Sequence, residues 1–219
     1  MTLFADDGLF GQAGADEAYG GVIDSQGRIL AVGHAGGFLA AARFTAAGAP
    51  DTTFSGDGFG LYSSGAQTGN TYDIVEQSTG RIILGGYRTG AGSWDWLLQA
   101  VTKNGAVDTD FGSNGQKAVS LSTGLEFAFD LEVDAADRLI LVGYLQGDAG
   151  HKDIGVARFL PDGQVDETFG PGGVQTFDLG FGDDIGHGLA LAADGRLLVA
   201  GHGKNASGNQ DFALLRIWP

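Results

Sequence analysis

The sequence predicts an all-β fold: a β-propeller of four blades, each with four antiparallel strands. The first observation behind this prediction is a fourfold repeat, in which a Phe is followed four residues later by a Gly and then by an Arg that begins an apolar run. The second is composition, because 40 Gly and 4 Pro among 219 residues, without the triplet period of collagen, indicate many short strands joined by tight turns. The third is spacing, which from that Gly to that Arg is identical in three of the four copies.

The repeat divides the chain into four units within one domain that covers residues 1–219. The units are residues 1–50, 51–107, 108–165 and 166–219. The Phe–Gly pairs are Phe4 and Gly8, Phe54 and Gly58, Phe111 and Gly115, and Phe169 and Gly173. The arginines are Arg28, Arg81, Arg138 and Arg196. Because every copy has this arginine, we interpret it as a residue that builds the blade by hydrogen bonding at a turn.

A hairpin forms the first half of each blade. The residue before each arginine is Gly in three copies and Asp137 in the other, which suits a turn position with positive φ. The residues after the arginine are almost continuously apolar, as in 139–142 and 197–200. Such a run predicts a strand that is buried on both faces, as expected where blades pack face to face.

Two further strands complete each unit. The third strand follows a loop of variable length, at residues 38–44, 96–101, 154–159 and 212–217. The fourth is less apolar and follows the Phe–Gly motif, at residues 9–10, 59–62, 117–121 and 174–177. Four antiparallel strands per repeat are typical of a propeller blade, and we label them a, b, c and d in chain order.

The phase of the repeat predicts how the ring closes. The chain begins with a d strand near Gly8 and ends on a c strand, so the last blade lacks a strand that the N-terminus has to spare. We predict that the N-terminal strand completes the last blade and protects its edge, which closes four blades within a monomer. The alternative is a dimer of open half-rings that makes eight blades.

Several motifs resemble the bacterial delta-60 β-propeller repeat family, and the resemblance covers essentially the whole chain. They are residues 51–54, 108–111 and 166–169, which share an Asp and a Phe, together with 194–201 and 211–216. The resemblance implies a propeller fold and transfers no catalytic residue. It also implies an exported bacterial protein, either secreted or held at the cell surface or in the periplasm. We expect any export signal to lie outside this sequence.

Composition excludes several classes of function. The net charge of −15 disfavours nucleic acids and anionic membranes as partners. The absence of Cys excludes disulfides, thiolate metal sites and a cysteine nucleophile. No nucleophile elbow, His-Glu-x-x-His motif or phosphate loop occurs in the sequence. We therefore predict no catalytic residue, no cofactor and no metal site.

Aromatic residues gather where the b–c and d–a loops should emerge on one face of the ring. Two columns of the repeat contain rings: Tyr19, Tyr72, Phe129 and His187 in one, and His34, Tyr87, Tyr144 and His202 in the other. Variable loops on a rigid scaffold are the usual place for binding. The predicted ligand-binding residues are Tyr19, His34, Tyr72, Tyr87, Trp94, Tyr144, His187 and His202. Rings with nearby polar groups suit a sugar or a small polar ligand.

These observations favour a non-enzymatic binding or scaffold module that holds a small polar ligand, a glycan or a protein partner on its loop face. One alternative is a propeller enzyme, a lyase or a glycoside-active protein, with its site at the axial mouth. Another is a structural fragment of a longer propeller. Ring closure would also bring His34 near His187 and His202, a set that could bind zinc or copper.

A second set of charged residues recurs in strand c. Asp95, Asp153 and Asp211 open the strand in three copies, and Arg43, Arg158 and Arg216 lie near its end in three copies. The odd spacing within the strand places the acid and the arginine on opposite faces. The hypothesis is that they form ion pairs between neighbouring blades.

Overall fold

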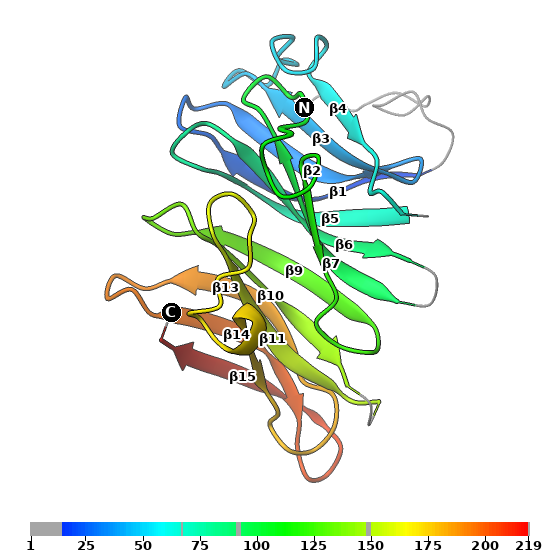
Figure 1. Ribbon diagram of the computed structural model, residues 1–219, viewed down its shortest axis with the longest axis vertical. Helices are drawn as coiled ribbons and strands as arrows, with labels where there is room; N and C mark the ends of the chain where they lie inside the picture. Colours follow the sequence, from blue (N-terminus) through cyan, green and yellow to red (C-terminus); the bar gives the residue numbers. More distant parts are fainter. Residues whose placement is uncertain (1–14, 67, 91–92, 148–149, 219) are drawn as a thin grey trace.

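The computed structural model describes residues 15–66, 68–90, 93–147 and 150–218, which form an all-β structure of four antiparallel sheets and one short 3-10 helix at Pro171–Gly173 (Figure 1). Blade 1 contains β1 (Asp16–Ile23), β2 (Ile29–Ala35), β3 (Phe38–Phe44) and β4 (Phe59–Tyr62). Blade 2 contains β5 (Thr68–Glu76), β6 (Ile82–Thr89), β7 (Trp94–Val101) and β8 (Gln116–Val119). Blade 3 contains β9 (Glu126–Val133), β10 (Leu139–Gln146), β11 (Lys152–Phe159) and β12 (Val174–Phe177). Blade 4 contains β13 (Ile185–Leu191), β14 (Leu197–Lys204) and β15 (Gln210–Ile217).

Each sheet is a meander whose strands lie in chain order, as predicted for a propeller blade. The turn between the first two strands has positive φ where the sequence predicts it, at Gly27, Gly80 and Gly195 and also at Asp137, whose φ is 60°. The outer strand of each blade directly precedes the inner strand of the next blade, since β4 precedes β5, β8 precedes β9 and β12 precedes β13.

The second strands are buried because their alternate side chains point to the two neighbouring blades. Leu30 and Val32 of β2 share a core with Ile82 and Leu84 of β6. Two further cores join blade 2 to blade 3 and blade 3 to blade 4 in the same way. We call the side of each sheet that packs on the following blade its forward face, and the opposite side its backward face.

The described blades form an open arc. Figure 1 shows the four sheets following one another along the long axis, with blade 1 and blade 4 at opposite ends. Each of the three cores joins consecutive blades, and none contains residues of both blade 1 and blade 4. The first strands of successive sheets contact one another, which places them along the inner side of the arc. The N-terminal strand that the sequence predicts to complete blade 4 lies outside the described residues.

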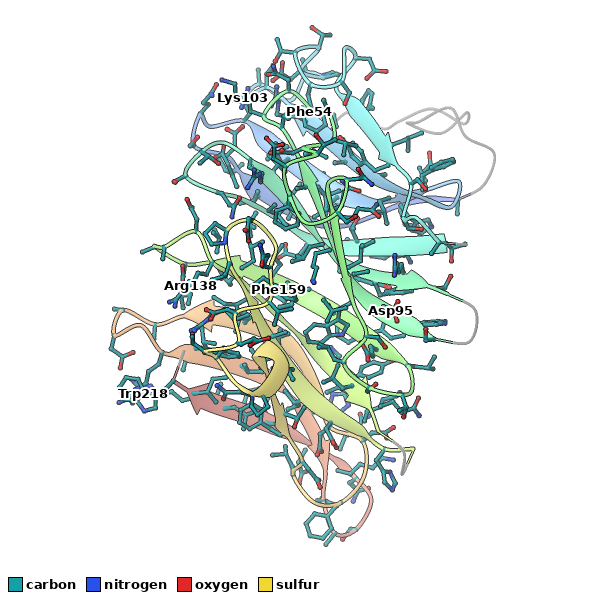
Figure 2. The ribbon with its side chains drawn as sticks, viewed as in Figure 1. Phe54, Asp95, Lys103, Arg138, Phe159 and Trp218 are labelled. Carbon is teal, nitrogen blue, oxygen red and sulfur yellow. The ribbon has the colours of Figure 1, made fainter. Side chains whose placement is uncertain are left out.

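The strand-c arginines do not form the predicted pairs, and Arg43 stabilises the junction of blades 1 and 2 by other contacts. The buried Arg43 donates hydrogen bonds to Asp51 over 2.8 Å, to Thr53 over 2.8 Å and to the carbonyl oxygen of Lys103 in blade 2. Its guanidinium lies 4.9 Å from the ring centroid of Phe54, which Figure 2 shows close to Lys103. Arg158 repeats the arrangement with the equivalent Asp, Thr and Phe.

The hypothesis that Arg43, Arg158 and Arg216 pair with Asp95, Asp153 and Asp211 is therefore wrong. In blades 1 and 3 the arginine forms an ion pair with the Asp of the motif that follows strand c, Asp51 or Asp166. This motif folds back under the arginine.

Blade 2 has Ala100 at this position, and Arg81, which directly precedes β6, replaces the missing side chain. Arg81 donates to Asp108 over 2.6 Å and to the carbonyl oxygen of Pro161 in blade 3 over 3.1 Å. Its guanidinium lies 5.7 Å from the ring centroid of Phe111. Asp108 and Phe111 of blade 2 thus also contact a guanidinium, although it belongs to Arg81 and not to a residue of strand c.

Candidate functional site

Each inner strand carries a β-bulge at the same place in the repeat. The register shifts between Ala18 and Gly20 in β1, and equivalent shifts occur in β5, β9 and β13. In each case one residue has no partner on the second strand. These residues are Tyr19, Tyr72, Phe129 and His187. A bulge leaves one residue unpaired and redirects its side chain. The first ring column of the sequence is therefore a column of bulge residues.

The bulge also explains the glycine that ends every apolar run. A β-carbon on Gly33 would lie 1.8 Å from the carbonyl oxygen of Glu17, and one on Gly143 would lie 1.7 Å from that of Phe127. The same clash, at 2.0 Å, would occur at Gly86 and Gly201. Only glycine lets the bulged backbone come this close.

The bulge residues of successive blades contact one another along the inner side of the arc. The ring centroids of Tyr19 and Tyr72 are 4.7 Å apart, those of Tyr72 and Phe129 are 5.8 Å apart, and those of Phe129 and His187 are 5.2 Å apart. One ring from each blade thus forms a continuous row across all four sheets.

The second ring column lies beside the first. His34 stacks 5.9 Å from Tyr19, and His202 stacks 5.1 Å from His187, measured between ring centroids. Tyr87 and Tyr144 fill the equivalent places in blades 2 and 3, each 6.0 Å from its bulge residue. The structure therefore brings together seven of the eight ligand-binding residues that the sequence predicts.

The eighth predicted residue, Trp94, stacks on Tyr87 with centroids 5.0 Å apart and an interplanar angle of 4°. A ring that the prediction missed, Phe127, joins both: it lies 4.3 Å from Tyr87 and 4.6 Å from Trp94. Its position two residues before Phe129 on β9 is the signal that could have identified it, since alternate residues of a strand share a face.

We call these ten residues the aromatic ladder: Tyr19, His34, Tyr72, Tyr87, Trp94, Phe127, Phe129, Tyr144, His187 and His202. The ladder is a surface, because Tyr19 is 42% exposed and His187 is also exposed, whereas Tyr87 and Tyr144 are buried and support the others. Rings that are half exposed and held in place by stacking present a rigid apolar face to a ligand.

Three ladder tyrosines, Tyr19, Tyr87 and Tyr144, keep their protons at physiological pH. A hydrogen bond donated to Glu17 is the main cause that raises the pKa of Tyr19 to about 12. Burial raises the pKa of Tyr87 and of Tyr144 to about 12. Burial, and then the neighbouring His202, lowers the pKa of His187, so this imidazole is neutral at pH 7. These three tyrosines and His187 therefore offer neutral rings, and the tyrosines offer hydroxyl donors.

The three histidines do not meet. His187 Nε2 lies 3.2 Å from His202 Nδ1, but His34 stacks on Tyr19 at the other end of the ladder. The expectation that ring closure gathers these imidazoles is wrong for the described chain, because blades 1 and 4 lie at opposite ends of the arc (Figure 1).

Two half-buried acids tie the inner strands together next to the ladder. Asp73 accepts a hydrogen bond from the backbone N–H of Leu131 over 3.1 Å, and Asp130 accepts one from Leu189 over 2.6 Å. Each acid follows a bulge residue and reaches the next blade. Burial, followed by the hydrogen bond with Asp130, raises the pKa of Asp73 to about 7.

A group of three acids lies at the loops between blades 3 and 4. One carboxylate oxygen from each of Asp153, Asp178 and Asp184 lies within 4.8 Å of the others. Asp184 is buried and accepts a hydrogen bond from the N–H of Leu179 over 2.6 Å. Burial and the charges of Asp178 and Asp184 raise the pKa of Asp153. These acids lie outside the ladder.

Comparisons with known proteins agree with this architecture. A family model described as a β-propeller domain of unknown function (DUF5122) matches residues 77–111, 136–169 and 192–219. The chain is a β-propeller protein. No curated protein matches the sequence.

Two solved structures are similar in arrangement at 10% identity and a TM-score of 0.40. One is virginiamycin B lyase from Staphylococcus aureus, where the match covers 90% of this chain and 69% of that one. The other is a streptogramin B lyase, where it covers 90% and 68%. Among the described residues, no helix is long and apolar enough to span a membrane.

Proposed function

We propose that the chain is a carbohydrate-binding module and that an oligosaccharide lies along the aromatic ladder. The observation that carries this proposal is the unbroken row of bulge rings, one from each blade, with centroids 4.7–5.8 Å apart. A bulge repeated in every blade, each with its required glycine, directs these rings away from the sheet.

The chemistry of the ladder matches a sugar. The ring faces can pack on the C–H face of a pyranose, while hydroxyl groups bond to neighbouring polar side chains. Glu17, Asn70 and Gln210 each contact a ladder residue, at Tyr19, Tyr87 and His202 respectively. Because Tyr19 and Tyr87 stay protonated, their hydroxyls can serve as hydrogen-bond donors.

The charge of the chain narrows the kind of sugar. With a net charge of −15, the protein repels uronic-acid and sulfated polymers, so a neutral or amino sugar is the expected ligand. The ladder crosses four blades, so affinity should rise with the number of sugar units. A secreted or cell-surface location, where such polymers occur, is part of the proposal.

The test is calorimetric titration with neutral oligosaccharides of increasing length, in glucose, xylose and N-acetylglucosamine series. We expect saturable binding that strengthens with length in one series. Tyr72→Ala and Trp94→Ala should each weaken it at least tenfold, which corresponds to about 1.4 kcal/mol.

Phe181→Ala is the matched control, because Phe181 is 57% exposed and lies outside the ladder. The proposal is overturned if no series binds at millimolar concentration, or if the control weakens binding as much as the ladder variants do.

A further inference from the structure

The two ends of the arc expose positions that are buried at every junction inside it. On the forward face of blade 4, Phe212 is 80% exposed, Leu214 is 62% exposed and the side chain of Arg216 is 51% exposed. The equivalent forward positions in blades 1 to 3 are 0–3% exposed. Those positions are Leu39, Ala41 and Arg43, then Trp96, Leu98 and Ala100, and then Ile154, Val156 and Arg158.

The backward face of blade 1 is uncovered at β2, whereas Ala40 and Ala42 of β3 on the same face are buried. Ala31 and Ile29 of β2 are half-buried, whereas the residues at these positions in blades 2 to 4 are at most 1% exposed. The residues covered in the other blades are Ile82 and Leu84, Leu139 and Leu141, and Leu197 and Val199. Both ends therefore carry apolar sheet faces that lack the neighbour the repeat provides elsewhere.

The two end faces also match in size. At the junction of blades 2 and 3, the large Trp96 of the forward face meets a backward face with Gly155 and Ala157 on β11. Blade 4 presents Phe212 and Leu214, and the backward face of blade 1 presents the small, half-buried Ala31 on β2. Large side chains at one free end can thus meet a small one at the other, as at an existing junction.

We propose that a second copy of this chain covers both ends, so that two arcs close into one ring of eight blades. The forward face of blade 4 of each copy packs on the backward face of blade 1 of the other. Such a contact joins two different surfaces, so it gives either a closed ring or an open filament. Propellers have about 4–8 blades, and with four blades per chain two copies reach the upper limit.

The row of inner strands would continue through the same contact. β1 and β13 lie at the two ends of this row, since β1 contacts β5, β5 contacts β9 and β9 contacts β13. In the dimer, the aromatic ladder would therefore continue from His187 to the partner's Tyr19.

The test is the mass of the purified 219-residue chain by sedimentation at micromolar concentration. We expect twice 22.5 kDa for the wild type. Phe212→Asp, on the forward end face, and Ala31→Arg, on the backward end face, should each give the monomer mass. Val107→Asp is the control, because Val107 is a 41% exposed apolar residue in a turn of blade 2.

Mixing the two variants distinguishes this contact from others. One junction of the mixed dimer combines both substitutions, but the other has two unaltered faces, so an equimolar mixture should return to the dimer mass. This recovery would also show that both variants are folded.

The proposal is overturned if the wild type is a monomer, or if it forms assemblies larger than a dimer. It is also overturned if only Phe212→Asp disrupts the dimer, since that would indicate two blade 4 faces in contact. None of these results depends on sugar binding.

Discussion

Blades 2 and 4 present aromatic residues at the same strand position in opposite environments. Trp96 of β7 pairs with Tyr87, and Phe212 of β15 pairs with His202 at the equivalent place in the register. Trp96 is 1% exposed, because blade 3 covers it, whereas Phe212 is 80% exposed. In a repeat array, burial is thus a property of the junction and not of the residue, so equivalent side chains should contribute very differently to stability.

Truncating these two rings gives the largest expected contrast. Trp96→Ala removes a ring from the core between blades 2 and 3 and should lower the free energy of unfolding by about 3–5 kcal/mol. Phe212→Ala removes a ring that no other blade covers, so in the monomer the change should stay within about 0.5 kcal/mol. Urea unfolding at low protein concentration measures both.

The contrast would fail if both truncations cost the same. If the Phe212 effect instead grew with protein concentration, that result would indicate burial of the ring by a second copy.

The strand-c arginines give a second contrast between the interior and the end of the arc. Arg43→Ala leaves the carboxylate of Asp51 with only the more distant Arg28, at 3.5 Å, and removes the bond to blade 2, so it should cost about 3 kcal/mol. Arg216 forms an exposed ion pair with Asp194, and Arg216→Ala should cost less than about 1 kcal/mol. Thermal unfolding of the two variants checks this, and a larger loss for Arg216→Ala would contradict the stabilising role assigned to Arg43.

The strand repeat and the ring columns could be predicted from sequence because they depend on local patterns. Turn glycines, apolar runs and aligned aromatic residues each occur in every copy, so aligning the four copies is enough to place Tyr19, Tyr72 and His187 in one column. The reason for the column, a β-bulge against Gly33 and its equivalents, needs the strand register, which the sequence does not contain.

Contacts between distant segments were harder to predict. The expected acid partners of Arg43 and Arg158 came from spacing within one strand, but the actual partners follow the strand and fold back under it. In blade 2, Arg81 takes the place of the arginine that is missing at Ala100. This depends on neighbouring segments of the blade that both reach the motif containing Asp108. The separation of His34 from His202 depends on the curvature of the whole arc, which no local pattern encodes.

The inner strands provide the smallest contrast, which depends on pH. Asp73 and Asp130 reach across the two junctions after blade 2, whereas blade 1 has Gly20 at this position. Burial and Asp130 raise the pKa of Asp73 from 3.8 to about 7 in the folded chain. The folded state therefore holds this proton more tightly than the unfolded state does. The stability that Asp73 contributes is complete below pH 4 and is lost as the pH rises toward 7.

Asp73→Asn should remove this dependence, because the amide is neutral and its oxygen can still accept the hydrogen bond from Leu131. Relative to the wild type, the variant should gain about 2–3 kcal/mol in the free energy of unfolding between pH 5 and pH 8. Asp110→Asn is the control, since Asp110 is exposed on a turn. Acids with a lowered pKa, such as Asp51 and Asp166, make the folded state more stable as the pH rises. Their contribution is the same in the variant and in the wild type. The difference between variant and wild type therefore isolates Asp73, and a difference that stays constant with pH would show that this carboxyl is ionised in the folded chain throughout that range.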